Sequence, residues 1–412
     1  MRHGRPSRDA RDTKRKHYFY SRKKCFCYSI QLYTQSKSNG GAKTTAGENR
    51  ISINGGADSM RKVNKKIIAN DGYELEVCLW LPENENIQKL VLYINSSGPH
   101  TYINTFKWTD DNIYHYQEYF AEKFCENNIA YCTYSTRGVH LSDESPFLKI
   151  KMDEYKTYLL SNSILDIEIL IDSLKCQKEL KHTQIYLFGV SEGTMIAPLF
   201  ALKHPGKVNG LLLTGYASFN MKDILIWQNN GGASMVWFKR YFDKDGDGKI
   251  SKEEYMQDPY NMAKTVLNNT SFEQIDVNKD GVIDKEDFAI ILKERLEGIL
   301  SAIEKKDDKW LLENYSIPLT TEWFRQYFEI KSNFETLQKL NLSIAIFHGE
   351  FDQNVDVKGV YAINEKFIEL GKTNLSVKVY SEMEHDIYFA NIVDITQCIE
   401  PITDLVNTVK GW

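Results

Sequence analysis

The sequence lacks any apolar run long enough to cross a membrane. None of its stretches approaches the 18 or more consecutive apolar residues of a transmembrane helix, and the longest runs, such as GLLLTGYA, have the length of a strand. The first residues also lack the continuous apolar core of a secretory signal peptide. We therefore expect no transmembrane segment. The apolar content of 42% is nevertheless sufficient for a sizeable folded core.

Cysteines are few and form no recognisable pattern. There are seven in 412 residues, an odd number, and they are scattered. Cys78, Cys132 and Cys176 lie in or beside apolar segments, where reduced and buried thiols are usually found. Cys25 and Cys27 have neither the spacing nor the second pair of a zinc site. A reducing compartment is therefore expected, and we predict a cytoplasmic protein.

Charge is unevenly distributed along the chain. The net charge is −5, but residues 1–60 carry 13 Lys and Arg against 4 Asp and Glu. Such a basic head can attract an anionic partner, but this one is polar and ends in a Gly, Ser, Asn and Thr-rich tract typical of disorder. Asp9 and Asp12 argue against a transit peptide. We predict a basic, disordered segment over 1–59, a domain that starts near residue 60, and no nucleic-acid partner.

Strand-like and helix-like segments alternate from residue 64 onward. The helix-like segments are 113–127, 159–175, 194–204, 358–371 and 392–409. The strand-like segments are 65–69, 73–81, 89–95, 129–134, 184–190, 207–217, 342–349 and 375–381. Alternation at this length predicts a mostly parallel sheet of about eight strands with helices on both faces. Asn70-Asp71-Gly72 indicates a tight turn that makes the first two strands antiparallel.

The pentapeptide Gly189-Val190-Ser191-Glu192-Gly193 matches the G-x-S-x-G pattern of a nucleophilic serine. The pattern alone is weak, because it also arises by chance. Its place between an apolar strand and a helix strengthens it, since a serine there is forced into a sharp, strained turn. Such a turn exposes the hydroxyl at the carboxyl end of the sheet. Ser191 is therefore the predicted nucleophile.

A serine hydroxyl needs a base to take its proton and an acid to orient that base. In this order of strands the acid comes first and the histidine last. Asp352 follows the strand at 342–349, with Glu350 and Asp356 as rivals. Only His385 lies beyond these candidates, in a loop after the next strand. We predict Asp352 as the acid and His385 as the base.

The negative charge of an acyl-transfer intermediate needs fixed hydrogen-bond donors. One predicted donor is the backbone amide of Glu192, which directly follows the nucleophile. The other should come from the loop after the third strand, NSSGPH, where we choose Ser97 and retain Gly98 as the alternative.

These segments resemble the α/β-hydrolase superfamily, especially its serine aminopeptidase-like and esterase branch. Members of that branch carry S-G-P after the third strand, R-G-V-G-K-S after the fourth and G-H-S-E-G-G at the nucleophile. The matching segments here are Ser97-Gly98-Pro99, Arg137-Gly138-Val139-His140-Leu141-Ser142 and Gly189-Val190-Ser191-Glu192-Gly193-Thr194. HGEFDQNV is similar to the family's H-G-x-x-D-x-x-V around its acid. The likeness covers about residues 64–220 and 340–412.

Several positions depart from this pattern. The charged residues that usually follow S-G-P are replaced by His100-Thr101-Tyr102, Val190 replaces a histidine, and Thr194 replaces a glycine. None of these changes removes a catalytic group, but they leave the substrate class open. The resemblance implies a cap over the active site between the sixth and seventh strands, where about 120 residues interrupt the alternation.

Residues 243–254 have the spacing of a calcium loop. Calcium prefers six to eight hard oxygens, which a twelve-residue loop supplies from positions 1, 3, 5, 7, 9 and 12, with glycine at position 6 for the bend. Gly248 occupies position 6, and Ile250 at position 8 is expected to pair with a sister loop. The predicted ligands are Asp243, Asp245, Asp247, the carbonyl of Lys249, Ser251 and Glu254.

The sister loop follows at residues 276–287. Gly281 occupies position 6, and Ile283 matches Ile250. Position 12 is Asp287, whose shorter side chain reaches less well for two-oxygen binding, so we predict weaker calcium binding or more magnesium here. The predicted ligands are Asp276, Asn278, Asp280, the carbonyl of Val282, Asp284 and Asp287. Together the loops and their flanking segments, about residues 232–300, resemble a paired EF-hand.

The sequence thus predicts an α/β-hydrolase core over 60–220 and 336–412 and a helical cap with two calcium sites over 221–335. The predicted activity is that of a serine hydrolase cleaving an ester or related acyl bond of a small-molecule substrate. A peptidase or an acyltransferase would use the same groups. A calcium-responsive binding protein without catalysis is the alternative from another class. Calcium either stabilises the cap or gates access, and the oligomeric state stays open.

Overall fold

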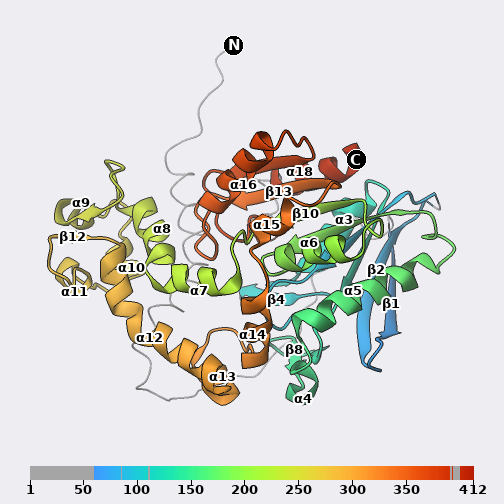
Figure 1. The fold of residues 1–412 in the computed structure, drawn as a ribbon, viewed down its shortest axis with the longest axis horizontal. Coiled ribbons are helices and arrows are strands. Elements are labelled where there is room, and N and C mark those ends of the chain that lie inside the picture. The colour runs from blue at the N-terminus through green and yellow to red at the C-terminus, as the bar shows by residue number, and fades with distance from the viewer. Residues whose placement is uncertain (1–59, 85, 110–111, 390–391, 393–399) are drawn as a thin grey trace, which may run out of the picture.

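The computed structural model describes residues 60–84, 86–109, 112–389, 392 and 400–412. The predicted N-terminal segment 1–59, with Cys25 and Cys27, lies outside the described residues. Eight strands form one sheet in the order β1-β2-β6-β3-β9-β10-β13-β14 (Figure 1). Their bounds are β1 (Met60–Ile68), β2 (Glu74–Pro82), β3 (Lys89–Ile94), β6 (Ile129–Tyr134), β9 (Gln184–Val190), β10 (Gly210–Thr214), β13 (Ser343–Gly349) and β14 (Leu375–Tyr380).

The pairing of these strands confirms the predicted sheet. β2 runs antiparallel to both β1 and β6, and every other neighbouring pair is parallel. The carboxyl ends of β3, β9, β10, β13 and β14 therefore lie at one edge, where the loops that follow these strands come together.

Helices cover both faces of the sheet because its side chains alternate in direction. Leu90 and Leu92 join an apolar cluster with α5 (Leu160–Lys175), α6 (Gly193–Lys203) and α16 (Lys358–Glu369). Val91 and Tyr93, one residue out of step, join a second cluster with α3 (Tyr116–Cys125) and α18 (Glu400–Gly411). Each buried side chain of this kind contributes on the order of 2 kcal/mol.

Two small hairpins were not expected from the sequence. β4 (Thr105–Thr109) pairs with β5 (Asn112–His115), so α3 begins at residue 116 rather than 113. The helical spacing predicted over 113–115 is wrong there, because backbone pairing with β4 takes precedence over local periodicity. The second hairpin joins β7 (Val139–Leu141) to β8 (Leu148–Ile150). α4 (Met152–Tyr155) follows it.

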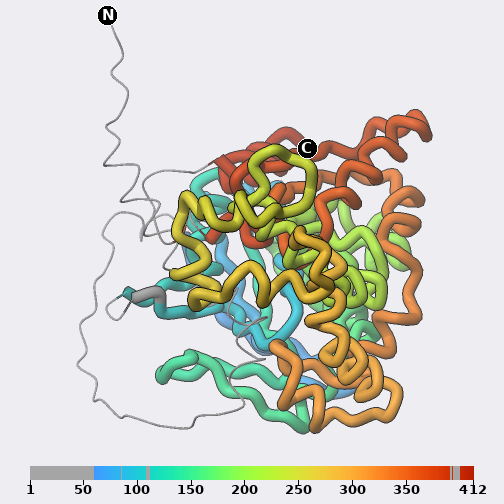
Figure 2. The backbone as a smooth tube through the Cα atoms, turned by 90° about the vertical axis from the view of Figure 1, so that its left-hand side faces the viewer, coloured from blue at the N-terminus to red at the C-terminus, as the bar shows by residue number. Residues whose placement is uncertain are grey.

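A long insert separates β10 from β13, the sixth and seventh strands of the sheet in chain order. Figure 1 shows it as a lobe on the left, and Figure 2, viewed from that side, shows its yellow and orange segments in front of the strands. Its elements are α7 (Met221–Asn229), α8 (Gly232–Tyr241), β11 (Ile250–Ser251), α9 (Lys252–Gln257), α10 (Met262–Thr265), α11 (Phe272–Ile275), β12 (Val282–Ile283), α12 (Lys285–Lys305), α13 (Asp308–Asn314), α14 (Thr321–Glu329) and α15 (Asn333–Leu337).

The insert packs in two different ways. Residues from Met235 to Leu292 form an apolar cluster of their own, separate from the two clusters on the sheet. The second half of α12, with Ile299 and Ala302, and then α13 and α14 belong instead to the cluster that contains α5 and α6. The insert therefore has an independent outer core and an inner part built into the body of the molecule.

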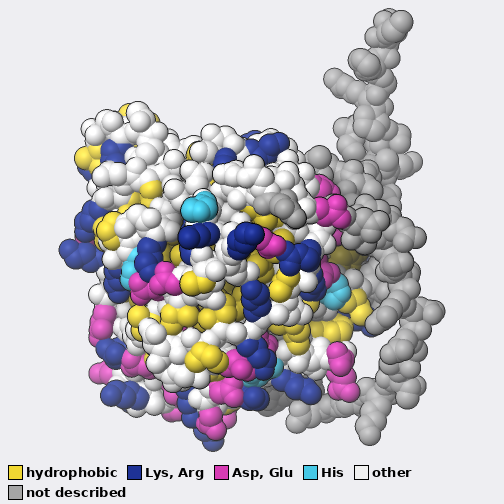
Figure 3. All heavy atoms as spheres, turned by 90° about the vertical axis from the view of Figure 1, so that its right-hand side faces the viewer, with side chains coloured by type: hydrophobic (Ala, Val, Ile, Leu, Met, Phe, Trp, Pro, Cys, Tyr) yellow, Lys and Arg dark blue, Asp and Glu magenta, His cyan; other side chains and the backbone are white. Residues whose placement is uncertain are grey.

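No helix in the described ranges is long and apolar enough to span a membrane. The face opposite the insert mixes basic, acidic and apolar side chains, as Figure 3 shows.

Candidate active site and calcium loops

The turn between β9 and α6 carries the predicted nucleophile. Ser191 has a φ of 54°, in the left-handed region that residues with a Cβ seldom adopt. Its amide donates a hydrogen bond of 2.9 Å to the carbonyl of Thr214, so the end of β10 holds the turn in place. This is the backbone geometry of a nucleophile elbow.

Two glycines make the elbow sterically feasible. A Cβ on Gly189 would lie 2.3 Å from the carbonyl oxygen of Gly193, and one on Gly193 would lie 2.4 Å from that of Ile94. Both distances are shorter than non-bonded contacts allow. The two glycines therefore let strand, helix and the end of β3 approach closely, as the motif predicts.

The structure joins the predicted acid to the predicted base. His385 Nδ1 and Asp352 Oδ2 are 2.7 Å apart. Asp352 is buried just after β13, and its Oδ1 also accepts hydrogen bonds from the amides of Asn354 and Val355, at 2.7 and 3.0 Å. Of the two rivals, Glu350 is exposed, and Asp356 accepts from the amide of Lys358 at 3.0 Å.

Electrostatics favour the charge separation that acyl transfer needs. Burial raises the pKa of Asp352, but the charge and hydrogen bond of His385 outweigh it and lower that pKa below its usual value. Burial lowers the pKa of His385, but the charge and hydrogen bond of Asp352 produce a net rise. The carboxylate thus stabilises the imidazolium that would form when His385 takes a proton.

The His385 ring also lies close to the nucleophile turn. A Cβ on Gly215 would stand 2.7 Å from its Cε1 and 3.0 Å from its Nδ1, so the ring rests on the backbone of Gly215. Gly215 directly follows Thr214, whose carbonyl binds the Ser191 amide. The Ser191 hydroxyl has no hydrogen-bond partner within the described part of the chain. Catalytic hydrogen bonds are often completed only in the substrate complex.

A second histidine, His348, lies next to the predicted acid. The Nδ1 of His348 accepts from the amide of Tyr216 at 3.0 Å, which leaves the proton of a neutral ring on Nε2. That Nε2 lies 3.3 Å from Asp352 Oδ2, outside hydrogen-bond geometry. Burial lowers the pKa of His348. His348 is thus a buried neighbour of the acid.

The predicted oxyanion donors occupy neighbouring loops. Neither the Ser97 amide nor the Glu192 amide donates a hydrogen bond to another described residue. Gly98 turns the loop with a φ of 105°, and its carbonyl accepts from the Thr136 hydroxyl at 3.1 Å. The contact of Gly193 with Ile94 brings this loop to the start of α6.

The burial of the Glu192 side chain was not predicted from the sequence. It is 1% exposed and accepts hydrogen bonds from the hydroxyls of Tyr158 and Tyr327 and, at 3.1 Å, from Trp323 Nε1. Burial raises its pKa to about 7, against the opposing effect of these donors. The only sequence signal is the four-residue step from Trp323 to Tyr327, which places both on one side of α14.

Arg137, in the turn after β6, ties distant segments together. Its side chain is 4% exposed and forms a two-pronged ion pair with Asp166, at 2.7 and 2.6 Å. A third bond of 2.6 Å reaches Asp71 in the first hairpin. Bidentate pairing suits the planar guanidinium, and here it fixes the turn whose Thr136 supports Gly98.

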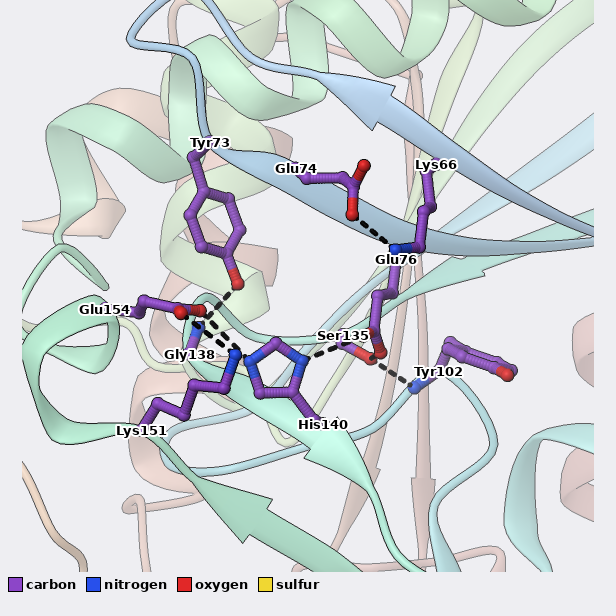
Figure 4. A network of polar contacts seen from close by, with 10 residues as sticks. All are labelled: Lys66, Tyr73, Glu74, Glu76, Tyr102, Ser135, Gly138, His140, Lys151 and Glu154. Atoms are coloured by element: carbon purple, nitrogen blue, oxygen red, sulfur yellow. Dashed lines mark hydrogen bonds and ion pairs between the residues drawn. The ribbon is translucent and has the colours of Figure 1, made fainter.

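A hollow of about 470 Å³ lies beside β1 and β2, away from these groups. Figure 4 shows polar contacts among residues that line it, where His140 Nδ1 bonds to Glu76 Oε1 at 2.8 Å and Nε2 to Glu154 Oε2 at 3.0 Å. Among the described residues that line it, none is a predicted catalytic residue, and each carboxylate already has a partner. We assign it no role in the chemistry.

The first predicted calcium loop brings three of its carboxylates together. Carboxylate oxygens of Asp243, Asp245 and Asp247 lie within 4.8 Å of one another. Gly248 has a φ of 89° at the bend. Glu254 accepts from the amides of loop positions 2 and 9, at 2.8 Å each, so the last ligand is already turned toward the loop. These residues fit a hard divalent cation.

The second predicted loop repeats the hydrogen bonds of the first with a shorter acid at its last position. Asp287 accepts from the amides of its positions 2 and 9, at 2.9 and 3.0 Å, as Glu254 does in the first loop. Asp276 accepts from the amides of Asp280 and Gly281, both at 3.2 Å. β11 and β12 join the loops antiparallel, with Ile250 opposite Ile283, which confirms the predicted pair.

Comparisons with known proteins agree with both parts. An EF-hand family model matches residues 240–257 and 269–292, and no curated protein sequence matches the chain. A thermostable carboxyl esterase from Bacillus coagulans, solved with glycerol, is 15% identical, with 86% of this chain and 99% of that chain covered and a TM-score of 0.50. An esterase from Pyrococcus furiosus is 14% identical, with 90% and 99% covered and a TM-score of 0.48. The chain has the α/β-hydrolase fold, interrupted between β10 and β13 by a paired EF-hand.

Proposed function

We propose that the protein is a serine hydrolase that cleaves an ester or related acyl bond. Ser191 Oγ attacks the acyl carbon while His385 Nε2 takes its proton, and Asp352 holds the resulting imidazolium. The amides of Glu192 and Ser97 bind the oxyanion. His385 then protonates the leaving group, and a water molecule activated by the same ring releases the acid from Ser191.

The hydrogen bond of 2.7 Å between Asp352 and His385 is the observation that carries this proposal. Residues 33 apart in sequence meet beside a strained serine turn, and a plain strand-to-helix turn would need neither partner. The structure from Bacillus coagulans that shares the fold is a carboxyl esterase. For this reason we propose an ester rather than an amide as the substrate.

We also propose that the EF-hand loops bind calcium. Asp243, Asp245, Asp247, the Lys249 carbonyl, Ser251 and Glu254 would hold the first ion, and the corresponding residues of 276–287 the second. A bound ion would supply positive charge that joins the helices flanking each loop. The boundaries at about 221 and 335 remain our proposal for the cap.

Labelling with a fluorophosphonate probe tests the enzymatic proposal, because such probes react only with an activated serine. We expect labelling of the wild type and none of Ser191→Ala. A panel of acyl esters and aminoacyl amides, with and without a calcium chelator, would then identify the bond cleaved. An unlabelled, correctly folded wild type would contradict catalysis and favour the calcium-responsive binding protein.

Calcium titration separates stabilisation from gating. A change in hydrolysis rate without a change in melting temperature would show gating. A parallel loss of both on chelation would show that calcium only keeps the insert folded.

A further inference from the structure

Arg240 lies in the last turn of α8, just before the first calcium loop begins at Asp243. Its side chain is only 10% exposed. Nη2 donates to the backbone carbonyl of Glu382 at 2.8 Å, and Nη1 donates to Glu384 Oε1 at 3.3 Å. A residue of the insert therefore contacts the loop that precedes His385.

The same guanidinium also contacts the loop of the acid. Its central carbon stands 4.4 Å from the centre of the Phe351 ring, within cation–π range. Phe351 directly precedes Asp352, and Glu384 directly precedes His385. One side chain thus touches the immediate neighbours of both members of the acid–base pair.

These two loops are tied to each other through their backbones. The Phe351 amide donates to the carbonyl of Met383 at 2.9 Å. Gly349 lies so close to the next loop that a Cβ there would be 2.1 Å from the carbonyl oxygen of Glu384. Arg240, from the insert, contacts both loops. Its planar guanidinium stacks on Phe351 of one loop and donates hydrogen bonds to the other, which suits arginine better than lysine.

The helix that carries Arg240 belongs to the EF-hand core. Phe238 on α8 packs against Phe288 on α12, with ring centroids 4.9 Å apart, and Trp237 lies in the same cluster. Helices that flank calcium loops change their mutual angle on calcium binding in sensor EF-hands. A rotation of α8 would shift Arg240 against the two loops.

We propose that Arg240 is a positioning residue that sets the Asp352–His385 geometry and transmits the state of the first calcium loop to it. The expected effect on the reaction rests on the proposed hydrolase function. The contacts of the Arg240 guanidinium with both loops do not depend on it.

The test compares two methionine variants of the full-length protein. Arg240→Met keeps the length of the side chain but removes the fork and the charge. Arg325→Met is the matched control, because Arg325 pairs with Glu322 and Glu329 of its own exposed helix face. Arg240→Lys keeps the charge without the planar fork, so it should restore only part of the function.

The first readout does not depend on activity. The Nδ1 proton of His385, bound to Asp352, should give a downfield NMR resonance, assigned by its absence in His385→Gln. We expect it in the wild type and Arg325→Met, and shifted or broadened in Arg240→Met. The same resonance in Arg240→Met as in the control would overturn the positioning role.

The second readout uses the reciprocity of linked sites. If calcium and the triad are coupled, covalent labelling of Ser191 must change calcium affinity, by a factor of about 5 to 150. Calorimetric titration would measure the ratio of calcium affinities with and without the label. We expect a ratio in this range for the wild type and Arg325→Met, and a ratio near one for Arg240→Met. An equal factor in both variants would overturn the coupling, as would its absence from the wild type.

The outcomes separate this inference from the hydrolase proposal. Failure of the wild type to react with the probe would remove catalysis, while the NMR comparison would still decide whether Arg240 positions His385. With catalysis intact, we expect Arg240→Met to react with the probe on the order of 10- to 100-fold more slowly. If Arg240→Met reacts with the probe as fast as Arg325→Met does, the positioning role of Arg240 is wrong, while the hydrolase proposal is unaffected.

Discussion

The catalytic candidates and the first calcium loop both depend on carboxylates, but in opposite surroundings. Asp352 is 1% exposed and is surrounded by donors from His385 and two backbone amides. Asp245 and Asp247 are exposed, and their loop comes from consecutive residues. At the first site the protein supplies every partner of the charge. At the second the carboxylates accept hydrogen bonds from amides of their own loop, and their remaining partner in our proposal is an ion from solution.

This difference explains how one chain can combine the two. Buried charges need fixed partners because desolvation is costly, and the catalytic candidates lie at the edge of the sheet, where such partners are available. Exposed carboxylates stay hydrated when no ion is bound, so the predicted calcium loops can lie in an insert that has its own core. Changes at the sheet edge should therefore be severe, and changes in the loops graded.

The largest effect is expected from Ser191→Ala, which removes the only attacking atom. We expect kcat to fall by about 10⁶-fold, with calcium still bound because the substitution changes none of the loop ligands. Hydrolysis assays and calcium titration would measure both. Ser161→Ala, at an exposed position of α5, is the control and should keep full activity. Substantial residual turnover in Ser191→Ala would assign the nucleophile elsewhere.

Asp352→Asn should lower kcat by about 10⁴-fold, because an amide cannot hold His385 in the required tautomer or stabilise its cation. Asp356→Asn tests the rival acid and should retain activity within about threefold of the wild type. The comparison is made by steady-state kinetics. A larger loss in Asp356→Asn than in Asp352→Asn would reverse the assignment.

Glu192 predicts a pH dependence of stability. Burial raises its folded pKa to about 7 from 4.5, so the folded state holds a proton that the unfolded state has lost in this range. Its contribution is fully present below about pH 4.5 and is lost as pH rises through 7. The change amounts to on the order of 3 kcal/mol.

Urea unfolding of wild type and Glu192→Gln across pH 4.5 to 8 would measure this contribution. We expect the wild type to lose stability relative to the variant as pH rises. A difference between the two proteins that stays constant with pH would show that Glu192 keeps its ordinary pKa.

The smallest effect is expected from exchanging the last ligands of the two calcium loops. Asp287→Glu should strengthen calcium binding at the second loop by about tenfold, because the longer side chain offers both oxygens. Glu254→Asp should weaken the first loop by a similar factor. Calorimetric titrations with calcium and magnesium would test both, and unchanged constants would show that arm length does not set the difference between the loops.

Several features could be predicted because their signals are local. The alternation of apolar residues predicted the eight strands, and the pairing of Ile250 with Ile283 followed from loop spacing. The hairpin of β4 and β5 could not be predicted, because the helical spacing that begins at residue 113 conceals it. The partners of Glu192 were equally hidden, since Tyr158 and Tyr327 lie 34 and 135 residues away.

The sequence alone indicated the twelve-residue calcium loops and the strained serine turn, because the residue types and spacings that mark them lie within short segments of the chain. Tertiary structure decided which acid meets His385, how Glu192 is buried, and that Arg240 bridges the insert and the sheet edge. These depend on loops from separate strands arriving at one place. Such an arrangement follows from packing across the whole sheet and leaves no periodic trace in the chain.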